Sequence, residues 1–190
     1  MLDILIIGAG PAGGSAALFA AKAGKKVVVV DNDRGLTKRA WLDNHYGVNG
    51  ISGPDLLAVG KEQATKFGAE FVEDKVNVIE QADNGLRVKT ESGAVYEAQH
   101  VIIATGFGMD VVEASGIQTT AGKEPKVAKI VDVDAKGRTS MPHVWAAGVI
   151  AGVSMHTIIT AGDGAKVAIN VLSEINGQRY VDHDVFKPSV

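Results

Sequence analysis

The opening of the chain constrains its fold more than any other stretch. Leu2 to Ile7 is a continuous apolar run, which is typical of a strand buried on both faces of a parallel sheet. A segment with the spacing G-x-G-x-x-G follows at once, from Gly8 to Gly13. Residues 15–23 are alanine-rich and predict a helix that ends before Gly24, and residues 26–30 predict a second buried strand. The chain therefore starts with a strand–helix–strand unit.

Each glycine of this segment has a physical reason in a dinucleotide site. Gly8 permits a tight turn, Gly10 leaves space for a pyrophosphate, and Gly13 lets helix and strand pack closely. The free amides and the positive dipole end of the helix would bind the pyrophosphate. Asp31 ends the second strand, where an acid accepts hydrogen bonds from the adenosine ribose and repels the 2′-phosphate of NADP. The fingerprint does not separate NAD from FAD, and a plain glycine turn is the alternative.

The rest of the chain predicts an α/β fold. Pro54 and Asp55 open a helix through about Phe67. Three short β-type runs separated by tight-turn sequences, at 76–80, 86–90 and 94–98, predict a three-stranded antiparallel meander. We expect further strands at 101–105, 127–133 and 144–147, a short helix near 109–114, and a last helix at 157–175. We therefore predict one domain over residues 1–190, with a Rossmann-like central parallel sheet, helices, the meander and a polar tail from about 177 to 190.

Composition excludes several classes of function. The net charge is −3 and the basic residues are scattered, so no nucleic-acid partner is expected. No apolar stretch approaches the ~20 residues that a membrane helix needs. The chain has no cysteine, which excludes a disulfide, a thiolate metal site and dithiol chemistry by these residues. Because the first residues lack the basic region of a signal peptide, we expect a cytoplasmic location.

Motifs later in the chain carry a family resemblance. Residues 101–106 read VIIATG, and four other stretches are NHYG (44–47), GPDL (53–56), FGAE (67–70) and GRTSMPHVWAAG (137–148). With these motifs the chain resembles the FAD domain of the thioredoxin reductase family of flavoproteins. The resemblance covers nearly the whole chain and implies FAD as the cofactor. Since no motif residue is assigned to the chemical step, we name no catalytic residue.

The resemblance also implies which residues bind FAD. They come from the fingerprint, the ends of the predicted strands and the start of the last helix: Gly8, Gly10, Pro11, Ala12, Gly13, Asp31, Asn32, Asn44, Val76, Ala104, Thr105, Gly106, Gly148, Val149, His156, Thr157 and Ile158. The last three would begin a helix beside the flavin pyrimidine ring, where His156 either adds a positive charge or only caps the helix. Trp41 either stacks on the ring or covers a hydrophobic face. The spacing of His100, His143 and His183 predicts no metal site.

Two departures from the family pattern limit what this chain can do. The family has an NADPH domain with redox cysteines between its A-T-G strand and its A-A-G-D segment, whereas only residues 107–127 separate Gly106 from Ala128 here. Thioredoxin reduction by these residues alone is therefore excluded. Val149 stands where the family has an aspartate that bonds a ribityl hydroxyl of FAD. Asp110 and Asp163 are the nearest acids in the sequence, and we expect both to be solvated surface carboxylates.

Two functions of different kinds remain. The first is a single-domain FAD oxidoreductase whose flavin exchanges electrons with an external donor, either NADH, NADPH or a redox protein. The alternative is a non-catalytic flavin- or nucleotide-binding module, such as one subunit of a larger redox assembly. An NAD-binding domain is a third, weaker interpretation. Either function is compatible with a homo-oligomer.

Overall fold

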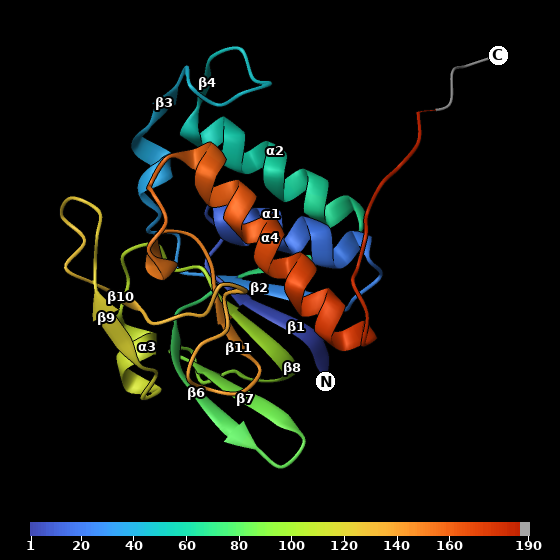
Figure 1. The fold of residues 1–190 in the computed structure, drawn as a ribbon, viewed down its shortest axis with the longest axis vertical. Helices are drawn as coiled ribbons and strands as arrows, with labels where there is room; N and C mark the ends of the chain where they lie inside the picture. Colours follow the sequence, from blue (N-terminus) through green and yellow to red (C-terminus); the bar gives the residue numbers. More distant parts are fainter. Residues whose placement is uncertain (187–190) are drawn as a thin grey trace.

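A mostly parallel seven-stranded sheet forms the centre of the computed structural model, which describes residues 1–186 (Figure 1). The strand order is β5-β2-β1-β8-β7-β6, and β11 also pairs with β8. These strands are β1 (Leu2–Ile7), β2 (Val27–Asp31), β5 (Glu70–Glu73), β6 (Val76–Ala82), β7 (Gly85–Thr90), β8 (Val95–Ile103) and β11 (Val144–Ala146). The five strands β1, β2, β5, β8 and β11 pair in parallel, while β6 and β7 continue the sheet in antiparallel pairing. The predicted fold class is confirmed.

Helices cover both faces of this sheet. The long helices α1 (Pro11–Lys22), α2 (Gly53–Lys66) and α4 (Thr157–Asn176) lie on one face (Figure 1). The short helix α3 (Asp110–Ala114) packs on the other face, against β6. Two small hairpins lie outside the sheet, β3 (Trp41–Leu42) with β4 (Ile51–Ser52) and β9 (Thr119–Ala121) with β10 (Lys129–Val131).

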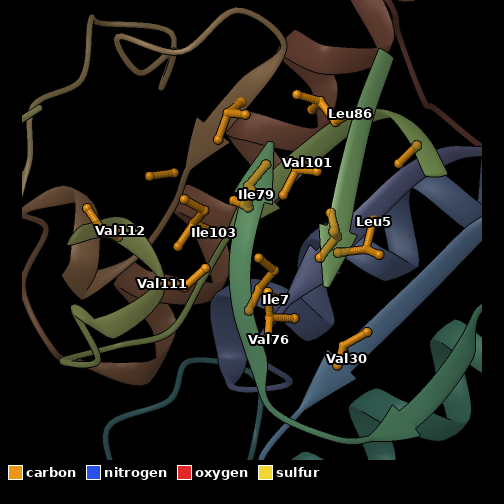
Figure 2. Packing of buried hydrophobic residues seen from close by; sticks show 14 of the residues in the cluster. Leu5, Ile7, Val30, Val76, Ile79, Leu86, Val101, Ile103, Val111 and Val112 are labelled. Atoms are coloured by element: carbon orange, nitrogen blue, oxygen red, sulfur yellow. The ribbon is translucent and has the colours of Figure 1, made fainter. Parts of the chain in front are cut away.

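The apolar runs of the sequence explain why the sheet has two buried faces. Along β1, Ile4 and Ile6 point to the face that α1 and α4 cover, whereas Leu5 and Ile7 point to the opposite face. The opposite face is packed by the meander and α3, and Figure 2 shows Leu5 and Ile7 close to side chains from β6 and β8. A strand between two hydrophobic layers needs apolar residues at every position, which is the pattern of Leu2 to Ile7.

The two strands expected at 94–98 and 101–105 are one continuous strand, β8. Its first half pairs with β7 and completes the predicted antiparallel meander. Its second half pairs with β11 on that side, while β1 pairs with it along the other side. Because β7 and β11 pair with successive parts of the same strand, β8 needs no break between its two halves. The meander is therefore continuous with the strand that ends at the site described below.

Other boundaries differ from the sequence-based expectations. Helix α1 begins at Pro11 rather than at residue 15, because proline suits the first helical position and the glycines there are tolerated. The strand expected at 127–133 is only three residues long and pairs with β9, which was not predicted, and β5 was missed as well. Among residues 1–186 no helix combines the length and the apolar character that crossing a membrane requires. The predicted polar tail lies outside the described residues from residue 187 onward.

Candidate functional site

A cavity of about 800 Å³ opens where the carboxyl ends of the central parallel strands meet. Its wall takes Gly10 from the loop after β1, Asp31 from the end of β2, Thr105 from the loop after β8, Ala147 after β11 and Thr157 from the start of α4. Open α/β sheets bind their ligands at this edge. The volume lies within the range of about 300–1,000 Å³ that is typical of cofactor pockets.

The three fingerprint glycines have different surroundings. A Cβ on Gly8 would lie 2.5 Å from the carbonyl oxygen of Ala104, and a Cβ on Gly13 would lie 1.8 Å from the carbonyl oxygen of Gly8. Both positions therefore need glycine for the close packing of β1, β8 and α1. A Cβ on Gly10 would meet no atom within 4 Å, because Gly10 faces the cavity. Gly10 is thus the fingerprint glycine whose missing side chain leaves space for a ligand.

The N-terminus of α1 presents unpaired donors to this space. Gly10 is its N-cap and Pro11 its first residue, and no side chain caps the first turn. The main-chain N–H groups of Ala12 and Gly13 have no acceptor within the helix, because the first turn of any helix leaves its donors free. Free donors together with the positive end of the helix dipole form an anion site. These residues fit the pyrophosphate of a dinucleotide.

Asp31 is held in place at the cavity wall by main-chain donors. Its Oδ1 accepts a hydrogen bond from the nitrogen of Ala9 at 2.9 Å, and its Oδ2 accepts one from the nitrogen of Asp33 at 3.0 Å. The first of these bonds ties the fingerprint loop to the end of β2. Each carboxylate oxygen has a further lone pair, so the side chain can still accept from a ribose hydroxyl.

Asp163 is not the solvated carboxylate that we expected. It lies inside α4, is 8% exposed, and its Oδ2 accepts a hydrogen bond from the main-chain nitrogen of Gly148 at 2.8 Å. Its Oδ1 lies 2.6 Å from Nζ of Lys166. Burial was missed because the sequence around Asp163 does not show that α4 crosses the turn after β11. The prediction for Asp110 is confirmed, because its side chain is 78% exposed.

Helix α4 crosses α1 closely beside the cavity. A Cβ on Gly164 would lie 2.0 Å from the carbonyl oxygen of Ala12, so glycine permits this crossing. The crossing directs the first turn of α4 into the cavity wall, where Thr157 is buried. Oγ1 of Thr157 lies 2.9 Å from Nδ1 of His45, in the loop between β3 and β4. This contact joins two segments that are distant in the sequence. Sequence reasoning named the neighbouring Asn44 as a site residue but did not name His45.

Val149 occupies the cavity wall as an apolar side chain. It is buried and packs with Val127, in the loop between β9 and β10, and with Ile130 of β10. It begins a short 3₁₀ helix, Val149–Ala151. Residue 149 therefore offers the cavity no carboxylate.

The outer part of the wall is largely apolar and partly exposed. Leu36, Trp41, Phe107 and Met155 all line the cavity and are at least 40% exposed. Trp41 donates from Nε1 to Asp43 at 3.1 Å, which orients its ring at the rim. A flat, apolar ligand such as a flavin ring fits a wall of this kind.

One acidic side chain at the rim is strongly perturbed. Hydrogen bonds from the hydroxyls of Ser92 and Thr90 lower the pKa of Asp74 to about 2, with the main-chain nitrogen of Lys75 as a further donor. Asp74 lines the cavity and stays ionised at neutral pH. Lys75 beside it pairs with Asp110 at 3.2 Å, so this side of the rim carries two carboxylates and one ammonium group.

The structure brings most of the predicted site residues together. All of them line the cavity except Gly13, Gly148 and Ile158. Gly13 packs beneath the fingerprint loop, Gly148 bonds Asp163, and Ile158 is 38% exposed in the first turn of α4. His156 lines the cavity as the N-cap of α4, and its Nδ1 lies 2.8 Å from the hydroxyl of Ser154. The wall also contains residues that no motif indicated, among them Arg34, Leu36, Thr37, Asp74, Phe107 and Met155.

Solved structures share this fold. The atypical thioredoxin reductase TRi from Desulfovibrio vulgaris Hildenborough has a TM-score of 0.82 at 19% identity, over 93% of this chain and 99% of that chain. A thioredoxin reductase from Gloeobacter violaceus has a TM-score of 0.78 at 19% identity, over 98% of this chain and 99% of that one. These likenesses establish the fold alone.

Curated relatives match at higher identity. Thioredoxin reductase from Aquifex aeolicus is 40% identical over 110 residues, which are 55% of this chain and 33% of that protein. Thioredoxin reductase from Peptoclostridium acidaminophilum is 34% identical over 136 residues, which are 70% of this chain and 43% of that protein. The chain thus spans less than half the length of these relatives. The sequence pattern of one family, Pyridine nucleotide-disulphide oxidoreductase, matches residues 2–71 and 53–165. This match, together with the fingerprint site and the shared fold, shows that the chain belongs to the pyridine nucleotide-disulphide oxidoreductase family.

Proposed function

We propose that residues 1–190 form a single FAD-binding domain that acts as an oxidoreductase, with the flavin reduced by an external donor. The observation that carries this proposal is the cavity at the carboxyl edge of the sheet, in which Gly10, the free amides of α1 and the carboxylate of Asp31 surround one continuous space. The space next to the fingerprint is polar, whereas the rim around Trp41 is apolar. A polar nucleotide half and a flat apolar ring half would each find a suitable surface.

A bound flavin would supply hydride and single-electron chemistry that no side chain provides. The chain's own residues would then bind and orient. The first turn of α1 would hold the pyrophosphate, and Asp31 would accept from the ribose. The N-terminus of α4, at Thr157, would place main-chain donors and partial positive charge at the inner end of the cavity. That charge would favour an anionic ligand group there.

The donor is proposed to be external for two reasons. Residues 1–190 contain no cysteine, so they cannot pass electrons through a dithiol of their own. The segment between β8 and β10 holds only α3, β9 and their connections, which leaves no space for a second nucleotide-binding domain. NADH, NADPH or a redox protein would therefore reach the flavin from outside these residues.

The apolar rim supports a second candidate function. Leu36, Trp41, Phe107 and Met155 are exposed around one opening, and clustered exposed apolar groups mark binding surfaces. In this alternative the chain is a flavin-binding subunit or module, and turnover requires a second polypeptide. A homo-oligomer is one form that such an assembly could take.

The test starts with purified protein from which the bound nucleotide is released and identified by mass spectrometry. Release of FAD at one per chain supports the proposal, and release of NAD or no nucleotide contradicts it. NADH and NADPH are then added without oxygen while the visible flavin absorbance is followed. Bleaching by either supports an oxidoreductase that accepts free nicotinamide. If only a partner protein restores bleaching, the subunit function is the correct one.

A further inference from the structure

A second group of side chains with ligand chemistry lies away from the cavity, where the C-terminal half of α4 crosses β8 and β11. His100 comes from β8, His143 immediately precedes β11, and Glu174 is near the end of α4. Each offers one ligand atom, and these atoms lie within 4.8 Å of one another. None of the three lines the cavity.

Strand register explains why the two histidines meet. Val144 of β11 is paired with Val101 of β8, and both side chains belong to the core on the α3 face. Side chains alternate along a strand, so His100, one residue before Val101, points to the opposite face. His143 precedes β11, and its main-chain oxygen accepts from the nitrogen of Val101 at 3.0 Å, which places it beside His100. Their rings pack edge to face with centroids 5.1 Å apart.

Helix α4 brings the acidic partner to the same place. Val167 and Val171 are buried on the face of α4 that packs against the sheet. Glu174 follows them at a spacing of three to four residues per turn, which places it on that face, one turn further along. Its Oε1 lies 3.8 Å from Nδ1 of His143.

We propose that His100, His143 and Glu174 form a binding site for a divalent transition-metal ion of the Zn²⁺ type. Two imidazoles and one carboxylate are a common ligand set for such an ion, with water in the remaining position. Ligand atoms on one zinc ion lie about 3.4 Å apart, given bond lengths of about 2.0–2.2 Å and tetrahedral angles. The three atoms therefore need to draw together by at most roughly 1.4 Å, and the half-exposed side chain of His143 gives both the freedom to move and an entry path.

The two oxygens of Glu174 have different partners. Nε of Arg138 donates to Oε2 at 3.0 Å, whereas Oε1 faces His143. Arg138 also lies over the ring of Trp145, with 4.9 Å from its guanidinium carbon to the ring centroid, which fixes the guanidinium. In metal sites, residues next to the ligands often hold them in orientation by hydrogen bonds. Arg138 would hold the carboxylate of Glu174 in this way, and Oε1 would remain for the ion.

The backbone of His143 offers a clean substitution for testing the site. Its φ is +64°, in the left-handed region where glycine is the residue without a steric penalty. Its main-chain oxygen accepts from the nitrogen of Val101 at 3.0 Å, so the conformation is held by the strand pairing. A side chain that can bind an ion therefore stands at a position where a glycine would be favoured for the backbone alone.

Trp145 provides a built-in reporter of metal binding. Its Nε1 donates to Nδ1 of His100 at 3.3 Å. If the metal binds Nδ1, that acceptor is occupied, and if it binds the other nitrogen, the ring proton must move to Nδ1. Either way Trp145 loses its acceptor. The chain has only two tryptophans, so Trp41→Phe leaves Trp145 as the single indole.

The experiment titrates Zn²⁺ into chelator-treated Trp41→Phe protein, and it compares this protein with the same protein carrying His143→Gly. We expect binding of one Zn²⁺ per chain, a rise in melting temperature and a change in Trp145 fluorescence. His143→Gly should fold at least as stably without metal, because glycine accepts the positive φ. It should lose at least tenfold in Zn²⁺ affinity together with the fluorescence change.

The matched control removes a histidine from elsewhere in the chain. His183 is exposed, so His183→Ala should bind Zn²⁺ as the parent protein does. Co²⁺ should give the visible absorption of a tetrahedral nitrogen and oxygen site in the parent and in His183→Ala only. The proposal is overturned if no saturable one-to-one binding is seen, if His143→Gly binds as tightly as the parent, or if His183→Ala loses as much affinity as His143→Gly. In each of these cases the three residues are an ion-pair cluster and nothing more.

Discussion

The carboxylate of Asp163, in the middle of α4, accepts a hydrogen bond from the main-chain nitrogen of Gly148 at 2.8 Å. This bond joins the last helix to the turn after β11, which carries one side of the cavity wall. Gly148 has φ +82°, and a Cβ there would lie 2.8 Å from Cβ of Ala12, so the turn is also confined by α1. The position of the wall therefore depends on a buried acid 15 residues further along the chain.

Asp163→Ala should lower the free energy of unfolding by about 1–3 kcal/mol, because it leaves the buried N–H of Gly148 without an acceptor. Asp163→Asn keeps an acceptor oxygen and should cost less. Urea unfolding at neutral pH measures both. As a control, Lys166→Ala removes only the half-exposed partner of Asp163 and should cost less than about 1 kcal/mol. Equal stability of Asp163→Ala and the parent would show that this bond does not hold the turn.

Gly10 separates ligand binding from folding. Gly10→Val adds a side chain to open space, so the protein should fold, but the side chain would occupy the place of the pyrophosphate. A steric cost of about 1–3 kcal/mol between the valine side chain and the pyrophosphate predicts roughly 5- to 150-fold weaker FAD binding. Titration calorimetry of FAD into the ligand-free proteins measures this loss of affinity. Undiminished affinity in a folded Gly10→Val protein would show that the pyrophosphate lies elsewhere.

Gly14→Ala is the matched control for that substitution. Gly14 lies one turn into α1, does not line the cavity, and its added Cβ would also meet no atom within 4 Å. Alanine inside a helix should raise the free energy of unfolding by about 0.5–1 kcal/mol and leave FAD affinity unchanged. Gly13→Ala, in contrast, should unfold the domain or nearly so, because its Cβ would collide with the carbonyl of Gly8.

Asp31→Ala should weaken FAD binding and also reduce stability. Both of its oxygens accept from main-chain nitrogens, those of Ala9 and Asp33, so the substitution frees the fingerprint loop as well as removing the ribose acceptor. We expect a loss of about 1–3 kcal/mol in unfolding free energy and a larger loss in binding. Asp31→Asn keeps one acceptor oxygen in place of two, so only part of the stability should return. Unchanged FAD affinity in both variants would identify Asp31 as a loop anchor only.

The hydroxyl of Ser92 should control the titration of Asp74. It donates to Oδ2 of Asp74 at 2.5 Å and is the main reason why the pKa of that carboxyl is about 2. Ser92→Ala should raise this pKa toward the ordinary value of about 3.9. Because the folded pKa lies below the unfolded one, the stabilisation is complete above about pH 4 and is lost as the pH falls toward 2. Carbon-13 shifts of the carboxyl measure the pKa, and an identical titration in Ser92→Ala would contradict the assignment.

The sequence predicted well those features that a local pattern determines. The apolar run of β1 indicated a strand buried on both faces, and G-x-G-x-x-G indicated its turn and the start of α1, because each of these depends on neighbours within a few residues. Short tight-turn sequences likewise predicted the meander of β6, β7 and β8. The last helix, expected at 157–175, is α4 at Thr157–Asn176.

Features that depend on how elements cross were not predictable in this way. Burial of Asp163, the contact of His45 with Thr157 and the meeting of His100 with Glu174 each join segments distant in the sequence. The hairpins β3–β4 and β9–β10 are only two or three residues per strand, which is too short for an alternating pattern to show. The spacing of the histidines did not indicate that His100 and His143 lie together, because the pairing of β8 with β11 cannot be read from spacing alone.

Val149 gives the sharpest test of how a flavin would lie in the cavity. Its side chain is 7% exposed and packs with Val127 and Ile130, so Val149→Asp should destabilise the ligand-free protein by about 1–3 kcal/mol through lost packing and burial of a polar group. If FAD binds with its ribityl chain beside residue 149, the new carboxylate should accept a hydrogen bond worth about 1.5–3 kcal/mol and tighten FAD binding.

Two control variants separate packing from charge: Val149→Ala reports the packing loss alone, and Val149→Asn has the shape of aspartate without its charge. Affinities from titration, with melting temperatures with and without FAD, separate the two effects. Tighter binding in Val149→Asp than in either control supports that orientation, whereas equal or weaker binding in the aspartate variant shows that the ribityl chain does not pass this residue.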